Sequence, residues 1–193
     1  WAQFGVGFGL LWADDLANAE PALLAAIDRS EEAGASYHRL LALLYLACCR
    51  RLRGNVEATR PVVAQSLEAA AEVDMPIYAG VAYAHLAWLH WRAGDHDAAR
   101  AEAEQAAALW GDYPYPFRWL GHWVLLAVQT ARGDLADAVT QAQAILHPSQ
   151  RRQPGKLPAV LETAMRAWEN GKPDETRAAL QRAIELAQGE GYL

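Results

Sequence analysis

The histidines are the first residues to test for chemistry, because imidazole can bind a metal ion or transfer a proton near neutral pH. Four of the six lie in the middle of the chain, at His85, His90, His96 and His122. Two histidines share a metal ion on a helix when they are four residues apart, but His85 and His90 are five apart, with no cysteine or carboxylate at ligand spacing. We therefore predict no metal site and expect His85 to be a hydrogen-bonding side chain, in the core or against a ligand.

The two cysteines are neighbours, Cys48 and Cys49, followed by Arg50 and Arg51. Adjacent residues on a helix point about 100° apart, so this pair is no disulfide framework, and a reducing compartment is expected. The arginines could lower a thiol pKa, but buried cysteines serve more often as small apolar side chains. The sequence also has no serine elbow and no His, Asp and nucleophile order typical of hydrolases. We predict neither an enzyme nor a bound cofactor.

Composition excludes two classes of partner. The 23 acidic residues outnumber the 17 basic ones, the net charge is −6, and no stripe of Lys and Arg offers a phosphate footprint, so nucleic acid is not expected. No apolar run approaches the roughly 20 residues that cross a bilayer. Because the chain opens at Trp1 without a Met or a basic signal segment, we expect a cytoplasmic fragment of a longer protein.

An internal repeat predicts how the elements are arranged. A Gly followed by Asp or Asn and an Ala-containing segment occurs at Gly54, Gly94 and Gly133, and more loosely at Gly171, at intervals of 40, 39 and 38 residues. Ahead of them, Asp14 stands in the same turn without its Gly. The spacing predicts one repeat domain of five units with a period of about 39 residues. The units are 1–35, 36–75, 76–114, 115–155 and 156–193.

Each unit is predicted to be two helices joined by a tight turn, in which Gly ends the first helix and Asp or Asn caps the second. The first helices are expected at 1–13, 36–53, 76–93, 116–132 and 157–170, and the second helices at 15–33, 55–73, 95–110, 134–147 and 173–188. Small residues such as Ala99, Ala103 and Ala106 let neighbouring helices approach closely. The fold class is therefore expected to be all-α, a right-handed α-solenoid.

One stretch carries a family resemblance. Residues Ala82 to Ala87, then Gly94 to Ala99, then Ala106, resemble the tetratricopeptide pattern. The longer period resembles the superhelical sensor domains of large bacterial ATPase regulators, such as the maltose-regulon activator family. The end of the chain, Glu190-Gly191-Tyr192-Leu193 included, is similar to the C-terminal region of bacterial proteins that join an ATPase module, often with a cyclase or transcription-regulator module, to a repeat domain.

The resemblance implies that the first helices line a concave groove. The candidate groove residues that bind a ligand or partner are Tyr45, Cys48, Arg51, His85, Trp88, Trp91, Arg92, Trp123, Met165 and Trp168. Aromatic side chains at helical spacing are more often core, so these rings either seal the axis of the solenoid or form a binding surface. The predicted function is a non-catalytic interaction or effector-sensing module of a bacterial signalling or transcription-regulating protein, which binds a peptide, a partner domain or a small ligand.

Two other segments offer alternatives. The first helix has no charged residue, and its large side chains could contact a second copy or a preceding repeat. They are Phe4, Phe8, Leu11 and Trp12. A structural scaffold that forms homo-oligomers is therefore the alternative function. The basic segment 147–158 is expected to be a solvated connector between helices. The less favoured alternative is that Arg151 and Arg152 contact an acidic partner or a phosphate.

Overall fold

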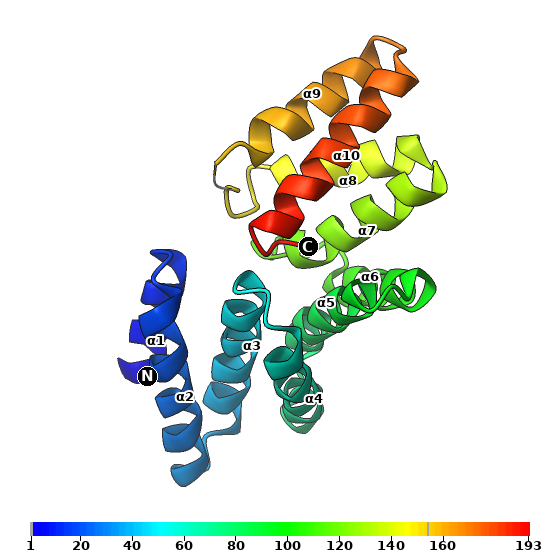
Figure 1. Ribbon diagram of the computed structural model, residues 1–193. Helices are drawn as coiled ribbons and strands as arrows, with labels where there is room; N and C mark the ends of the chain where they lie inside the picture. Colours follow the sequence, from blue (N-terminus) through cyan, green and yellow to red (C-terminus); the bar gives the residue numbers. More distant parts are fainter. Residues whose placement is uncertain (1, 154) are drawn as a thin grey trace.

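The chain folds into helices, as its pattern of turns predicts. The computed structural model describes residues 2–153 and 155–193, and within them it contains ten helices and no strand (Figure 1). The helices are α1 Ala2–Trp12, α2 Leu16–Glu32, α3 Ser36–Leu52, α4 Val56–Glu72, α5 Pro76–Arg92, α6 His96–Trp110, α7 Trp119–Arg132, α8 Leu135–Leu146, α9 Leu157–Glu169 and α10 Pro173–Gly189. Their bounds agree with the predicted ones to within three residues. No helix in the described ranges combines the length and apolar character needed to cross a bilayer.

The turns between paired helices form as the sequence predicts. Gly54 has φ +67°, in the left-handed region that favours glycine, and Asn55 caps α4 by accepting a hydrogen bond at Oδ1 from the Ala58 amide at 3.1 Å. In the first turn Asp14 takes the left-handed position, with φ +65°. Aspartate tolerates this conformation better than most side chains, which explains how the first turn forms without a glycine.

Helix contacts follow the chain order and then change at the last pair. Each helix contacts the next one, and α1, α3, α5 and α7 also contact one another in series. In the last pair α10, and not α9, contacts α7, while α9 contacts α8 and α10. The long segment between α8 and α9 permits this change, because it carries the chain around the end of α7 before α9 begins. Helix α9 therefore does not continue the series of first helices.

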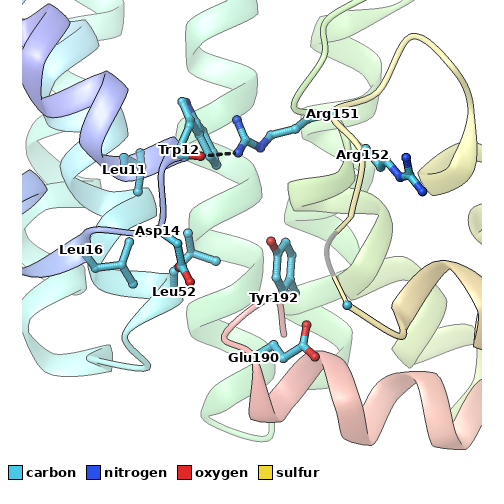
Figure 2. Close-up of a pocket in the computed structure, with 10 residues that line it drawn as sticks. Leu11, Trp12, Asp14, Leu16, Leu52, Arg151, Arg152, Glu190 and Tyr192 are labelled. Carbon is cyan, nitrogen blue, oxygen red and sulfur yellow. Dashed lines mark hydrogen bonds between the residues drawn. The ribbon is translucent and has the colours of Figure 1, made fainter.

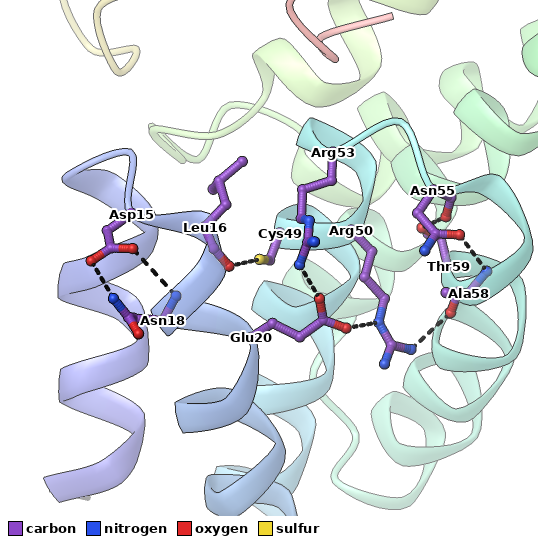
Figure 3. A network of polar contacts seen from close by, with 10 residues as sticks. All are labelled: Asp15, Leu16, Asn18, Glu20, Cys49, Arg50, Arg53, Asn55, Ala58 and Thr59. Carbon is purple, nitrogen blue, oxygen red and sulfur yellow. Dashed lines mark hydrogen bonds and ion pairs between the residues drawn. The ribbon is translucent and has the colours of Figure 1, made fainter.

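A polar network fixes the first pair of helices against the second (Figure 3). Glu20 on α2 accepts a hydrogen bond from Arg50 Nε at 2.8 Å and another from Arg53 Nη1 at 2.7 Å. Arg50 Nη1 also donates to the Ala58 carbonyl on α4 at 2.8 Å. Because one carboxylate joins Arg50 of α3 to Arg53 just after it, and Arg50 also reaches α4, the network holds three successive helices in a fixed relation.

The chain bends so that its C-terminal end approaches the first two helix pairs. In Figure 1 the red C-terminal end of α10 lies beside α7 and close to the end of α3. Arg51 on α3 donates a hydrogen bond from Nη2 to the carbonyl of Tyr192, 141 residues later, and Gly191 lies directly against the Leu52 backbone. A second contact joins Arg151 to the Trp12 carbonyl. The described helices thus form an arc whose C-terminal end and 147–153 segment return to the first two helix pairs.

Candidate ligand-binding cleft

Half of the predicted groove residues are in the core. Arg51, His85, Trp88 and Trp123 have no exposed surface, and Cys48 is 2% exposed. Burial raises the pKa of the Cys48 thiol to about 12, so this cysteine is a protonated apolar side chain at neutral pH. Burial likewise lowers the pKa of His85 well below its usual value, with the positive charge of Arg51 acting in the same direction. These five side chains fill the inside of the arc.

The other five predicted groove residues do not converge. Tyr45 and Trp91 are half-buried, and Arg92 is exposed. Met165 and Trp168 lie on α9, which makes no contact with α7 in the part of the chain that the structure describes. Trp168 is 38% exposed. The binding role predicted for these side chains stays a prediction, but the structure does not gather them on one surface.

Arg51 forms the most unusual arrangement in the core. Its guanidinium has no carboxylate partner among the described residues, and instead it donates to three backbone carbonyls: Ala84 at 3.3 Å, Leu120 at 3.0 Å and Tyr192 at 2.6 Å. Its central carbon also lies 5.6 Å from the ring centre of Trp88, a distance at which a cation and an aromatic ring attract one another. Burial lowers the pKa of Arg51 to about 9. The side chain joins α3, α5, α7 and the C-terminal segment.

The aromatic side chains predicted for self-association pack inward. These are Phe4, Phe8 and Trp12, and Leu11 beside them is 2% exposed. The Phe8 ring meets the Tyr45 ring edge-on with centres 4.9 Å apart, and the Trp12 ring stacks on Phe117 with centres 5.1 Å apart. The side chains that cover Trp12 come from α3, from the residues just before α7 and from the segment after α8. The outer face of α1 is instead marked by Val6, which is 52% exposed.

A cleft of about 410 Å³ opens where the two ends of the arc meet (Figure 2). One wall is the turn between α1 and α2 together with the end of α3, and the other is the segment after α8 together with the end of α10. The lining residues are Leu11, Trp12, Asp14, Leu16, Leu52, Arg151, Arg152, Gly155, Glu190 and Tyr192. Its volume is within the range of about 300–1,000 Å³ that is usual for small-molecule sites.

Arg151 joins the two walls of this cleft. Its Nη2 donates to the Trp12 carbonyl at 3.0 Å, and its guanidinium carbon lies 3.9 Å from the centre of the Trp12 ring. Its backbone amide donates to the Pro116 carbonyl at 2.9 Å, which fixes the segment in front of α7. Burial lowers the pKa of Arg151, while Tyr192 acts in the opposite direction.

Two glutamines hold the segment that carries Arg151. Gln150 accepts a hydrogen bond at Oε1 from the Trp119 amide, at the start of α7, and donates from Nε2 to the Tyr115 carbonyl at 3.0 Å. Gln153 is 3% exposed and accepts at Oε1 from Trp123 Nε1 at 3.3 Å. The expectation of a solvated connector is therefore wrong for this part of 147–158, because its amide side chains satisfy polar groups of α7.

The remaining charged groups of the cleft have no ion pairs. Asp14 on the first wall, and Glu190 and Arg152 on the second, form no salt bridge within the described residues. Burial raises the pKa of the Glu190 carboxyl. It also raises the pKa of Tyr192 to about 12, a shift that Arg151 opposes. Tyr192 therefore keeps its phenolic proton at neutral pH and can donate a hydrogen bond into the cleft.

The described lining of the cleft combines charged, hydrogen-bonding and apolar side chains. Among the described residues its lining contains no cysteine, serine or histidine, and its ionisable groups are the carboxylates of Asp14 and Glu190, two guanidinium groups and the phenol of Tyr192. In the described ranges no group of three or more His, Cys, Asp and Glu side chains is placed to hold a metal ion. What the arrangement can do is recognise a ligand by charge, hydrogen bonds and apolar contact.

In comparisons with known proteins, no family model, no curated protein and no solved structure matches the chain.

The sequence analysis names Trp12, Arg151 and Arg152 but does not bring them together. Trp12 was predicted as an interface residue, and Arg151 and Arg152 as part of a connector. Nothing in the local pattern joins residues at opposite ends of the chain. The one signal present was Gly191, since a glycine just beyond a helix often marks a turn or a close approach of two backbones.

Proposed function

We propose that this chain is a non-catalytic binding module that senses a small effector, with the cleft between the two ends of the arc as its binding site. The observation that carries the proposal is the position of the cleft, whose walls are joined by the hydrogen bond between Arg151 and Trp12, residues 139 apart in the sequence. The resemblance implies that such a module consists of tetratricopeptide-like repeats in a right-handed solenoid. It also implies that the module belongs to a cytoplasmic bacterial signalling protein.

The mechanism follows from ligand binding across two walls. A ligand that contacts both walls binds the closed arc more tightly than an open one. It therefore shifts the population toward the closed arc, and the size of the shift is set by the ratio of its affinities for the closed and open states. The bond and the ring contact between Arg151 and Trp12 already favour closure. A bound ligand would add its own contacts to this bond and ring contact and so change the relative position of the two ends of the arc. A linked domain could respond to that change in position.

Nuclear magnetic resonance tests the proposal. A library of amino acids, nucleotides, sugars, carboxylates and polyamines is added at millimolar concentration to the 193-residue chain. At least one compound is expected to shift the indole signal of Trp12 together with the amides of Gly155 and Tyr192. The indole of Trp168 is the matched control, because it is a partly exposed tryptophan on α9 and outside the cleft. The proposal fails if no compound shifts the three cleft signals together.

Self-association is the second candidate function. It is favoured by the outer face of α1, where Val6 is 52% exposed on a helix without a charged residue. A second copy that covered this face would bury Val6 and the neighbouring small residues. Sedimentation velocity over a wide concentration range tests it, since a monomer at every concentration contradicts this function, and so does a dimer that persists unchanged in Val6→Glu.

A further inference from the structure

The charges around the cleft are balanced but unpaired, and this limits which ligand it can accept. Asp14 and Glu190 contribute two carboxylates, and Arg151 and Arg152 contribute two guanidinium groups. None of the four forms an ion pair within the described residues. In Figure 2 Asp14 lies on the wall formed by the turn between α1 and α2, and Glu190 lies below Tyr192 on the other wall, which also carries the two arginines. Each wall therefore carries a carboxylate, and the second wall also carries both guanidinium groups.

A ligand with a single charge fits this arrangement poorly. An anion would be attracted to the arginines but would place its charge in the same small cavity as two carboxylates, and a cation would meet the reverse problem. A ligand with one group of each sign can present its ammonium to the carboxylates and its carboxylate to the arginines. Electrostatic complementarity therefore favours a zwitterion.

Size and apolar surface narrow the class further. The volume of about 410 Å³ is near the lower end of the usual range for ligand sites, which suits a small molecule. Leu16 and Leu52 flank Asp14 and are only partly buried, so they offer apolar surface next to the carboxylate (Figure 2). A short apolar group attached close to an ammonium would lie against these two side chains.

We infer that the cleft binds the zwitterion of an α-amino acid with an apolar side chain. The ammonium lies between Asp14 and Glu190, the carboxylate faces Arg152, and the side chain packs on Leu16 and Leu52. Arg152 is exposed, and its guanidinium points away from Tyr192 in Figure 2, so it turns inward to meet the ligand. The inference rests on the proposed function, because it names the chemical class of the effector for the same cleft.

Calorimetric titration with three related probes tests the charge requirement. L-leucine carries both charges, N-acetyl-L-leucine carries only the carboxylate, and L-leucinamide carries only the ammonium. L-leucine is expected to bind at least about tenfold more tightly than either analogue, because each analogue loses one charged hydrogen-bonding group. Glycine is expected to bind more weakly than L-leucine, because it lacks the apolar group. Equal affinities for L-leucine and either analogue, or for L-leucine and glycine, would overturn the inference.

Charge-neutral variants assign each group. Arg152→Gln is expected to weaken L-leucine about tenfold and to leave L-leucinamide unchanged. Asp14→Asn keeps a side chain that tolerates the left-handed conformation and is expected to weaken L-leucine without affecting N-acetyl-L-leucine. Arg60→Gln and Asp28→Asn, at exposed positions on α4 and α2, are the matched controls and should bind L-leucine as the parent chain does. Circular dichroism confirms that each variant is folded.

The outcomes separate this inference from the proposed function. If L-leucine does not bind while another compound of the library shifts the Trp12, Gly155 and Tyr192 signals, the ligand class is wrong and the binding module stands. If neither L-leucine nor any other compound shifts these signals, both proposals fail. Binding of L-leucine that Arg152→Gln and Asp14→Asn leave unchanged places the ligand elsewhere and overturns the inference alone.

Discussion

Replacing Arg51 by alanine is expected to loosen the C-terminal segment from α3. Arg51 donates to the carbonyls of Ala84, Leu120 and Tyr192. Ala84 and Leu120 lie inside helices, so their carbonyls keep an intrahelical donor when the guanidinium is removed. The Tyr192 carbonyl has no second donor among the described residues. Arg51→Ala therefore leaves one buried carbonyl without a partner and a cavity at the side chain.

The change in the free energy of unfolding combines losses from the missing contacts with a gain from removing a buried charge. A buried carbonyl without a partner costs about 1–3 kcal/mol, and a large-to-small change in a core costs about 2–5 kcal/mol. Removing a buried charge that has no counter-ion gives back several kcal/mol. We expect Arg51→Ala to lower the free energy of unfolding by about 3 kcal/mol. Arg51→Met fills the space and also removes the charge, so it is expected to cost about 1 kcal/mol or less.

Urea unfolding, followed by circular dichroism and tryptophan fluorescence, measures both free energies. Hydrogen exchange of the Tyr192 and Leu193 amides, which donate to the Ala187 carbonyl, reports the local effect. Both variants should exchange these amides faster than the parent chain, because both lose the bond to the Tyr192 carbonyl. The reasoning is refuted if Arg51→Met costs as much as Arg51→Ala, or if neither variant changes the exchange of these amides.

Three further predictions concern the close approach at Gly191, the buried imidazole of His122 and the helix cap at Asn55. Gly191→Ala should lower the free energy of unfolding in urea by about 1–3 kcal/mol, because Gly191 has φ +76° and a Cβ there would collide with the Leu52 backbone. Gly189→Ala is the control and should not destabilise the chain, because a Cβ at Gly189 meets nothing within 4 Å. Burial lowers the pKa of His122 to about 4, so the unfolded chain binds a proton at this residue below about pH 6.5 while the folded chain does not. The free energy of unfolding should therefore fall by up to roughly 3 kcal/mol between pH 6.5 and 4. His122→Asn should reduce this loss when unfolding is measured as a function of pH. Asn55→Ala removes the cap of α4 and should cost about 1 kcal/mol in the same assay, and an unchanged midpoint would contradict the capping role.

The helices and their turns could be predicted because they depend on local signals. The recurrence of Gly with Asp or Asn at intervals of 38 to 40 residues predicts the end of one helix and the cap of the next, and the observed bounds follow it closely. The largest difference is at α7, which begins at Trp119 instead of residue 116. Tyr113 to Pro116 contains two prolines, and proline disfavours the helical conformation of the residue before it.

The cleft could not be predicted, because it depends on contacts between distant residues. The bond from Arg51 to Tyr192 joins residues 141 apart, and the bond from Arg151 to Trp12 joins residues 139 apart. Periodicity places each side chain on a face of its own helix but does not say where the end of the chain returns. The same limit applies to α9, whose side chains were expected beside those of α7, although α10 occupies that place.

A double-mutant cycle between Trp12 and Arg151 measures whether the two ends of the arc hold each other. Trp12→Leu, Arg151→Gln and the double variant are compared by urea unfolding. The contact between guanidinium and ring predicts a coupling energy of about 0.5–2 kcal/mol, whereas a control cycle of Arg151→Gln with Trp168→Leu should be additive. Additivity of Trp12→Leu and Arg151→Gln to within about 0.3 kcal/mol would contradict a closed arc.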